Sequence, residues 1–120
     1  QTHCTNPLLK TESIDKAINL FIEYFPDNDS LFSVTKVQKR FWDKVLNPVN
    51  HDPNNLLRTQ DLEPFYEENS CLYIFSRDVM LSRNNRLGKT PKIFELPRNE
   101  AWDIDEEIDF KFAELLYKNS

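Results

Sequence analysis

The sequence predicts an α/β domain in which a mixed, mainly parallel sheet is flanked by helices. One observation is an amphipathic helix pattern followed directly by a short strand pattern, an order typical of α/β folds. Another is the recurrence of strand patterns further along the chain, and a third is a second amphipathic pattern near its end. Because 120 residues is the size of one ordinary domain, we expect a single domain over 1–120.

The first predicted helix covers residues 11–25. Its apolar residues follow the i, i+3, i+4, i+7 spacing of one helical face and are Ile14, Ala17, Ile18, Phe21, Ile22 and Phe25. Thr11 is the expected N-cap, and Pro26 is expected to end the helix.

Three short segments read as strands because they are rich in β-branched and aromatic residues, and they are 30–35, 71–75 and 91–96. The polar stretch between the last two, with Arg83 and Arg86, is expected to form a solvated turn. After 103–107, the spacing of Ile108, Phe112, Leu115 and Leu116 predicts the final helix.

Residues 37–68 interrupt this pattern with irregularly placed aromatic residues and three X-Pro turns. A connection of about 30 residues is longer than usual in a compact domain and is commonly functional or interfacial. We therefore interpret 37–68 as an inserted excursion. Its Phe41 and Trp42 are expected to pack in a subunit interface.

Composition excludes several classes of protein. A net charge of −5 argues against a binder of nucleic-acid polymers, and no apolar run is long enough to span a membrane. The only glycine, Gly88, leaves no glycine-rich phosphate loop. Cys4 and Cys71 lack metal-ligand spacing and are expected to be reduced and buried in a cytoplasmic protein.

The most specific local feature is Asp103-Ile104-Asp105. In an extended segment these two carboxylates point to the same side, and Mg²⁺ is held in proteins by one or two carboxylates together with phosphates and waters. The alternative is that Asp105 caps the last helix. On spacing alone the cap is the commoner role, and both roles are compatible.

A second polar run, Arg58 to Pro64, could bind a sugar acid, with Arg58 gripping its carboxylate. The alternative is a solvated loop. His3 and His51 have no second ligand at zinc spacing, so a zinc site is not expected.

Taken in order, these segments resemble the acylneuraminate cytidylyltransferases, the enzymes that load sialic acid and related nonulosonic acids onto CMP. His3-Cys4-Thr5-Asn6-Pro7-Leu8 is similar to the Gln-Pro-Thr-Ser-Pro-Leu segment of that family. Arg58 to Pro64 is similar to its Arg-Gln-Asp-Leu-Pro-Pro run, and Glu68 to Phe75 to its Glu-Asn-Gly-x-Ile-Tyr-Ile strand. The strand at 30–34 and Asp103-Ile104-Asp105 complete the match, which spans nearly the whole chain.

The resemblance implies the C-terminal part of a Rossmann-like nucleotidyltransferase sandwich that uses CTP and Mg²⁺ and forms a homodimer through the excursion. It implies Asp103 and Asp105 as metal ligands and Arg58, assisted by Lys44, as the grip on the sugar acid. His3, Glu68, Tyr73 and Phe75 are the other substrate-binding residues that it implies.

The family's glycine-rich CTP motif is expected to precede Gln1, so the chain alone is expected to be inactive and to associate with another copy or change its fold. His3 for Gln, Leu9 for Arg and Ser70 for Gly leave the individual sugar open. Two alternatives remain, a relative of the CMP-Kdo synthetases and a non-enzymatic dimerisation module.

Overall fold

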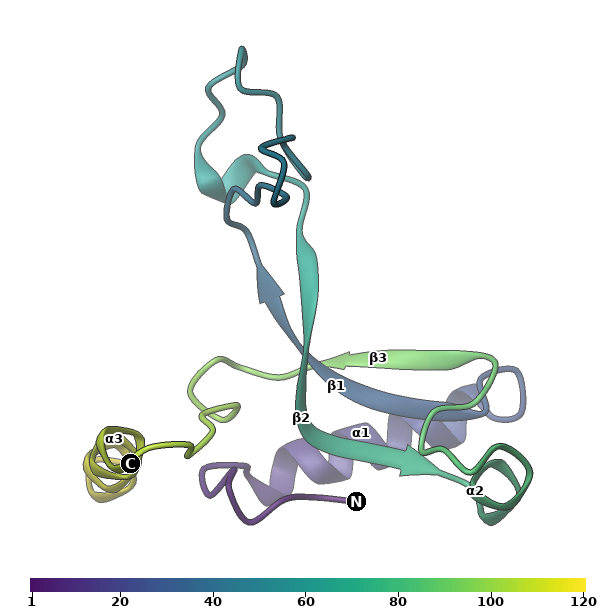
Figure 1. Ribbon diagram of the computed structural model, residues 1–120. Helices are drawn as coiled ribbons and strands as arrows, with labels where there is room; N and C mark the ends of the chain where they lie inside the picture. The colour runs from purple at the N-terminus through teal and green to yellow at the C-terminus, as the bar shows by residue number, and fades with distance from the viewer. The chain divides into compact units, whose positions relative to one another are not determined.

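The computed structural model describes residues 1–120 and divides into two compact units. The first unit comprises Gln1–Thr35 and Glu68–Ser120, and the second comprises Lys36–Glu67. The elements in chain order are α1 (Thr11–Tyr24), β1 (Ser30–Val37), the short 3₁₀ helix η1 (Thr59–Asp61), β2 (Phe65–Phe75), α2 (Arg77–Arg83), β3 (Pro91–Glu95) and α3 (Glu107–Lys118) (Figure 1).

The sheet has three strands in the order β2-β1-β3. β1 and β3 are parallel, with Ser30 opposite Pro91 and Val34 opposite Glu95. β2 runs in the opposite direction to β1 (Figure 1), so the sheet is mixed. The predicted α/β class, both long helices and all three strands are confirmed, although β2 is longer than the predicted segment.

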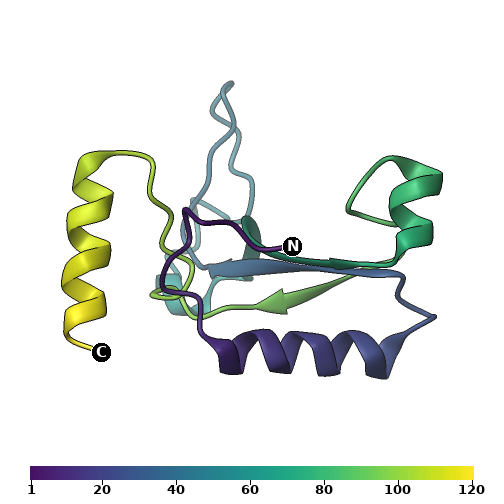
Figure 2. The same ribbon diagram turned by 90° about the horizontal axis from the view of Figure 1, so that it is seen from below.

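Helix α1 covers one face of the sheet (Figures 1 and 2). Ala17 of the helix packs with Leu31 of β1 and Leu72 of β2 in a cluster of buried side chains. Leu20, Phe21, Ile74 and Phe94 pack around that cluster, so the helix contacts residues of all three strands. This contact stabilises the sheet, because burial of apolar area drives folding.

The predicted N-cap of α1 is wrong. The helix begins at Thr11, and Lys10 is the N-cap residue, with no side chain of its own closing the cap. Instead, Glu100, which is 5% exposed, accepts a hydrogen bond from the Lys10 N–H (3.0 Å) and from the Ser13 hydroxyl (2.7 Å). A carboxylate at this position satisfies free N–H groups and complements the helix dipole.

Helix α2 was not predicted. It begins at the Ser76 N-cap, whose hydroxyl accepts the Val79 N–H at 3.2 Å, and it ends at Asn84 in the left-handed conformation. Arg83 therefore lies in the last turn of a helix. The prediction that Arg83 and Arg86 line a solvated turn is wrong for both, because the Arg86 guanidinium stacks on a buried aromatic ring.

The cap of α3 also differs from the prediction. Its N-cap is Glu106, and Asp109 in the first turn accepts the backbone N–H groups of Glu106 (2.9 Å) and Asp105 (3.1 Å). The alternative role of Asp105 as the helix cap is therefore wrong. Its carboxylate and that of Asp103 are exposed and form no ion pair with a basic side chain.

One carboxylate, that of Asp29, links the segments where β1 and β3 begin. Asp29 accepts the N–H groups of Lys89 (2.8 Å) and Thr90 (3.1 Å) and the Ser30 hydroxyl (3.1 Å). Burial raises the pKa of Asp29, but these hydrogen bonds outweigh that effect and lower it. Gly88 is buried against the same carboxylate, because a Cβ there would lie 2.1 Å from Asp29 Oδ2.

Neither cysteine is bonded to the other. Cys71 is fully buried, as predicted, but Cys4 is exposed, so the prediction that both are buried is wrong for Cys4. No helix has the length and apolar character needed to cross a membrane.

Candidate sugar-acid and metal site

The first cluster of polar groups surrounds Tyr73 on β2. Its ring is buried, and its hydroxyl donates to Glu68 Oε2 at 2.5 Å and lies 3.2 Å from Ser70 Oγ. Burial raises the pKa of the Tyr73 phenol, and the hydrogen bond to Glu68 raises it further. The phenol therefore keeps its proton and is available as a neutral hydrogen-bond donor and acceptor.

Two groups from other parts of the chain approach the same ring. The guanidinium carbon of Arg86 lies 3.9 Å from the ring centroid, a cation–π distance, and the ring of His3 lies 6.3 Å away. The backbone of Gln1 and His3 reaches this position because Thr2 bridges to Leu72 of β2. Hydroxyl, carboxylate, imidazole and guanidinium groups thus lie around Tyr73, and such groups bind hydroxyls and a carboxylate.

The path of β2 beside this cluster depends on two residues that precede Cys71. Ser70 has a φ of 60°, in the left-handed region that non-glycine residues seldom adopt. The Asn69 side chain accepts from Ser33 (2.5 Å) and from the Cys71 N–H (3.2 Å) and donates to Thr35 (3.1 Å). These bonds fix the turn of the strand that directs Glu68 and Tyr73 toward each other.

The second cluster lies around the segment that precedes α3. The Asn6 amide nitrogen lies 3.4 Å from the Trp102 carbonyl oxygen and 3.5 Å from Asp103 Oδ1. The Ile104 N–H donates to the Thr5 carbonyl at 2.9 Å, which ties the same segment to the first residues of the chain. Asp103 is thereby held beside residues 5 and 6 and beside β2.

The pKa of Cys71 shows that the carboxylates of Asp103 and Glu100 lie near β2. Burial, and then the negative charges of Asp103 and Glu100, raise the pKa of the Cys71 thiol to about 11. Cys71 is adjacent to Leu72 and two residues from Tyr73, so the acidic segment and the Tyr73 cluster lie along neighbouring positions of one strand.

Asp103 and Asp105 are chemically suited to Mg²⁺, although the chain has no group of three or more side chains placed to hold a metal. Both carboxylates are exposed, and neither is in an ion pair with a basic side chain. Two free carboxylates are what a magnesium site that takes its other ligands from phosphates and water requires.

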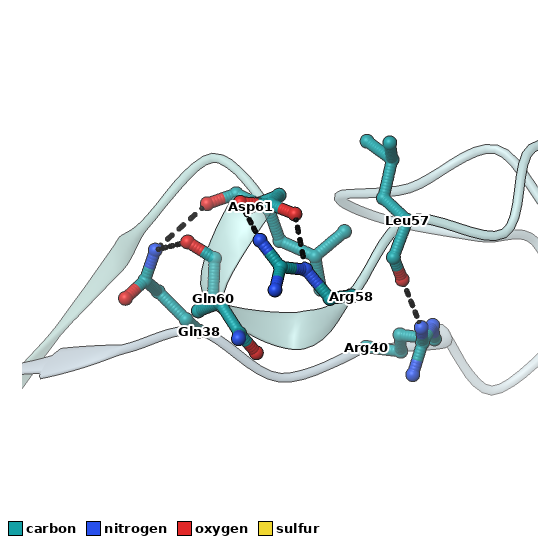
Figure 3. A network of polar contacts seen from close by, with 7 residues as sticks. Gln38, Arg40, Leu57, Arg58, Gln60 and Asp61 are labelled. Atoms are coloured by element: carbon teal, nitrogen blue, oxygen red, sulfur yellow. Dashed lines mark hydrogen bonds and ion pairs between the residues drawn. The ribbon is translucent and has the colours of Figure 1, made fainter.

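The two residues predicted in the excursion belong to the second unit. Arg58 pairs with Asp61, with 2.9 Å between Arg58 Nε and Asp61 Oδ2, and its side chain is 72% exposed (Figure 3). Lys44 is exposed. The guanidinium of Arg58 is thus held by a neighbour three residues along, in a surface pair that costs little to open.

The polar frame of the second unit is built on backbone carbonyls. Gln38 donates to the carbonyls of Gln60 and Leu62, both at 3.0 Å, and Arg40 donates to the Leu57 carbonyl (Figure 3). Only two hydrophobic side chains of this unit, Val37 and Leu62, are buried. Its large exposed hydrophobic side chains are Phe41, Trp42, Val45, Leu46, Val49, Leu56, Leu57, Phe65 and Tyr66.

Comparison with known proteins identifies relatives of the chain by sequence. The chain is 29% identical over 122 residues to the pseudaminic acid cytidylyltransferase of Campylobacter jejuni, covering 97% of this chain and 52% of that protein. It is 28% identical over 117 residues to post-translational flagellin modification protein B of Campylobacter coli, covering 93% of this chain and 49% of that protein. The CMP-N,N'-diacetyllegionaminic acid synthase of C. jejuni is 35% identical over 68 residues, which are 57% of this chain and 29% of the synthase.

The chain is a distant homologue of the nonulosonic acid cytidylyltransferases. No family model matches it. The chain spans about half the length of the pseudaminic acid cytidylyltransferase that it matches.

The backbone conformation of Ser70 explains why glycine would suit this position. The family resemblance pairs Ser70 with the glycine of a Glu-Asn-Gly motif. Ser70 is one of three non-glycine residues with a positive φ, and glycine adopts that conformation without steric cost. The serine keeps the turn and places a hydroxyl 3.2 Å from Tyr73.

Three residues of the site were not singled out from the sequence. Glu100 was overlooked because its two partners lie at the start of α1, almost the whole chain away. The sequence predicts Arg86 in a solvated turn and presents Asn69 only as part of a motif. The one available signal was the polar Glu68-Asn69-Ser70 run directly before a buried strand.

Proposed function

We propose that this chain is the sugar-acid and metal-binding part of a cytidylyltransferase that transfers CMP from CTP to a nonulosonic acid and releases pyrophosphate. The observation that carries the proposal is the homology to a pseudaminic acid cytidylyltransferase, over 52% of that protein, and to a CMP-N,N'-diacetyllegionaminic acid synthase, over 29% of that protein. In this interpretation the mixed sheet is the C-terminal part of a Rossmann-like nucleotidyltransferase sandwich.

The Tyr73 cluster supports the assignment of the sugar site. The Tyr73 hydroxyl, Glu68 and His3 can exchange hydrogen bonds with sugar hydroxyls, and Phe75 follows Tyr73 along the strand. Arg86 is a cation within the same unit that has no carboxylate partner in an ion pair. In the proposed site it is a group for the acid's carboxylate. The grip of Arg58, assisted by Lys44, on that carboxylate stays a proposal from the family resemblance.

Asp103 and Asp105 are proposed to hold Mg²⁺, which when bound neutralises charge on the phosphates of CTP. The chain's own residues leave these two carboxylates without a basic partner. The α3 cap is supplied by Glu106 and Asp109, so neither Asp103 nor Asp105 is used in closing the helix. The anomeric hydroxyl of the sugar would attack the α-phosphorus of CTP, with pyrophosphate leaving. The cytoplasmic location stays a prediction.

Isothermal titration calorimetry tests the sugar site directly. Pseudaminic acid, N,N'-diacetyllegionaminic acid and the eight-carbon acid Kdo would be titrated separately into the chain. We expect heat from a nine-carbon acid and a loss of affinity of about tenfold in Tyr73→Phe and in Arg86→Met, because each removes one hydrogen-bonding or charged group. Preference for Kdo would instead favour the relative of the CMP-Kdo synthetases.

The metal assignment needs a separate titration with CTP or CMP in the presence and absence of Mg²⁺. Asp103→Asn is expected to abolish the Mg²⁺-dependent part of the heat, and Asp15→Asn, which changes an exposed carboxylate on α1, serves as the matched control. If a folded chain binds neither a sugar acid nor a nucleotide, the proposal is wrong and the non-enzymatic dimerisation module is the better interpretation.

The homodimer is proposed from the second unit, because nine large hydrophobic side chains exposed within 32 residues form a surface typical of an interface. Analytical ultracentrifugation is expected to show a dimer that Leu56→Ser weakens. Leu56 is 87% exposed, so the change does not disturb packing within the unit. Leu81→Ser on α2, with Leu81 68% exposed, is the matched control. A monomer at all concentrations contradicts the homodimer.

A further inference from the structure

The two carboxylates of the proposed metal site lie on a short segment that leads into α3. Between them is Ile104, which lines an apolar groove of about 350 Å³ together with Leu8 and Phe110. The apolar residue of the segment thus packs against the domain, whereas Asp103 and Asp105 on either side of it are exposed. Affinity for a divalent cation then depends on how firmly these two exposed carboxylates are held in place.

Different parts of the chain hold the two carboxylates. The loop before α1 holds the first: the Asn6 amide nitrogen lies 3.5 Å from Asp103 Oδ1, and the Ile104 N–H donates to a carbonyl of the same loop at 2.9 Å. Asp105 has a single hydrogen bond, from its backbone N–H to Asp109 Oδ2 at 3.1 Å. The position of Asp105 therefore depends on Asp109.

Asp109 is itself held by a contact across the same segment. The Trp102 indole N–H donates to the Asp109 carbonyl at 2.9 Å, and the Trp102 ring meets Phe112 edge to face with 5.7 Å between the centroids. The Asp109 carboxylate also accepts the Glu106 N–H at 2.9 Å. Trp102 and Asp109 thus join the two ends of the segment that carries both aspartates. A segment closed in this way loses less conformational freedom when a cation binds.

The hydrogen bonds of Asp109 distinguish it from the two proposed ligands. Its Oδ2 accepts two backbone N–H groups at the positive end of a helix, and both effects offset the charge of the carboxylate. Asp103 and Asp105 have no basic partner, so their charge is available to a cation. In metal proteins, loss of a group that orients a ligand typically costs roughly 10- to 100-fold in metal affinity.

We propose that Asp109 is a positioning residue for the divalent cation, because its carboxylate holds the backbone of Asp105 and so keeps the Asp105 carboxylate in place for the cation that Asp103 also binds. The inference rests on the proposed function, since it takes Asp103 and Asp105 as the metal ligands. Asp109 contributes a hydrogen-bond acceptor and is not itself a ligand. The acceptor oxygen, and not the negative charge, is therefore what cation affinity requires of this residue.

The test compares two variants of equal charge. Asp109→Asn keeps an oxygen that accepts the Asp105 N–H, whereas Asp109→Ala removes it. Mg²⁺ is titrated into the folded chain, and its dissociation constant is obtained from the NMR shift of the Ile104 amide, whose own partner lies outside the segment. We expect Asp109→Asn to bind Mg²⁺ within about threefold of the unchanged chain, and Asp109→Ala to bind it about tenfold more weakly than Asp109→Asn.

A capping residue far from the metal ligands in the sequence provides the structural control. Ser76→Ala removes the hydroxyl that accepts the Val79 N–H at the start of α2. It should lower the urea midpoint of unfolding, as Asp109→Ala does, but leave the Mg²⁺ dissociation constant unchanged. Trp102→Phe is a second, milder variant, which keeps an aromatic ring but removes the donor to the Asp109 carbonyl. It should weaken Mg²⁺ binding by about threefold.

Equal dissociation constants for Asp109→Asn and Asp109→Ala would overturn the inference. A loss of more than about tenfold in Asp109→Asn would also overturn it, because Asp109 would then be a ligand. In both cases, binding that Asp103→Asn abolishes would leave the proposed metal site standing. Absence of Mg²⁺ binding to the unchanged chain, or binding that Asp103→Asn does not alter, would instead contradict the metal assignment and the inference with it.

Discussion

Gly88→Ala is predicted to destabilise the chain by about 3 kcal/mol, although Gly88 does not have a positive φ. The new Cβ would lie 2.1 to 2.2 Å from all three carboxylate atoms of Asp29, so the whole group must move. It would then lose the hydrogen bonds from Lys89, Thr90 and Ser30. At about 1 kcal/mol for each bond, the loss sums to about 3 kcal/mol.

Urea unfolding followed by circular dichroism measures this loss, and a double-mutant cycle identifies its cause. In an Asp29→Ala background the carboxylate is gone and its space is free, so Gly88→Ala should cost less than about 1 kcal/mol. Two results would refute the reasoning. One is a cost below about 1 kcal/mol for Gly88→Ala alone, and the other is a full cost that persists when Asp29 is alanine.

Three further outcomes are expected. Glu100→Ala should destabilise the chain by about 1 to 2 kcal/mol in urea, because it removes the carboxylate that caps α1; Glu114→Ala, at an exposed site on α3, should cost little. Because Cys71 has a pKa of about 11 when folded and an ordinary value of 9.0, its thiol stabilises the fold below about pH 9. That stability, about 3 kcal/mol, should be lost as the pH rises toward 11, and the loss should be absent from Cys71→Ala in parallel urea titrations. At pH 8 a thiol reagent should modify exposed Cys4 rapidly and Cys71 only after denaturation; rapid reaction of two thiols in the folded chain would contradict its burial.

The sequence predicts well the elements whose buried residues recur at regular spacing along the chain. The apolar residues of α1 repeat along one face, and residues such as Leu31 and Leu72 fall in short β-rich runs, so local pattern and tertiary packing agree. Helix α2 escaped prediction because it has seven residues and only one buried side chain, Val79. A single buried position gives no period to detect.

The predicted capping residues of α1 and α3 are wrong for a different reason. The sequence offers Thr11 and Asp105 at plausible positions, but the groups that close the two helices are Glu100, from the other end of the chain, and Asp109, from inside α3. Local spacing cannot reveal a partner that only the fold brings close. The family resemblance predicts His3, Glu68 and Tyr73 as substrate-binding residues, and the structure brings these three side chains together. The position of Arg86 on the Tyr73 ring could be found only from the structure.

The bonds made by Asn69 bear on how the second unit is attached. Ser33 and Thr35 lie just before the segment 36–67 and Asn69 just after it, and the amide of Asn69 bonds both hydroxyls. The two ends of that segment are therefore fastened side by side by residues outside it. Because these bonds lie outside the segment, its length and sequence can change between related proteins while β1 and β2 stay paired.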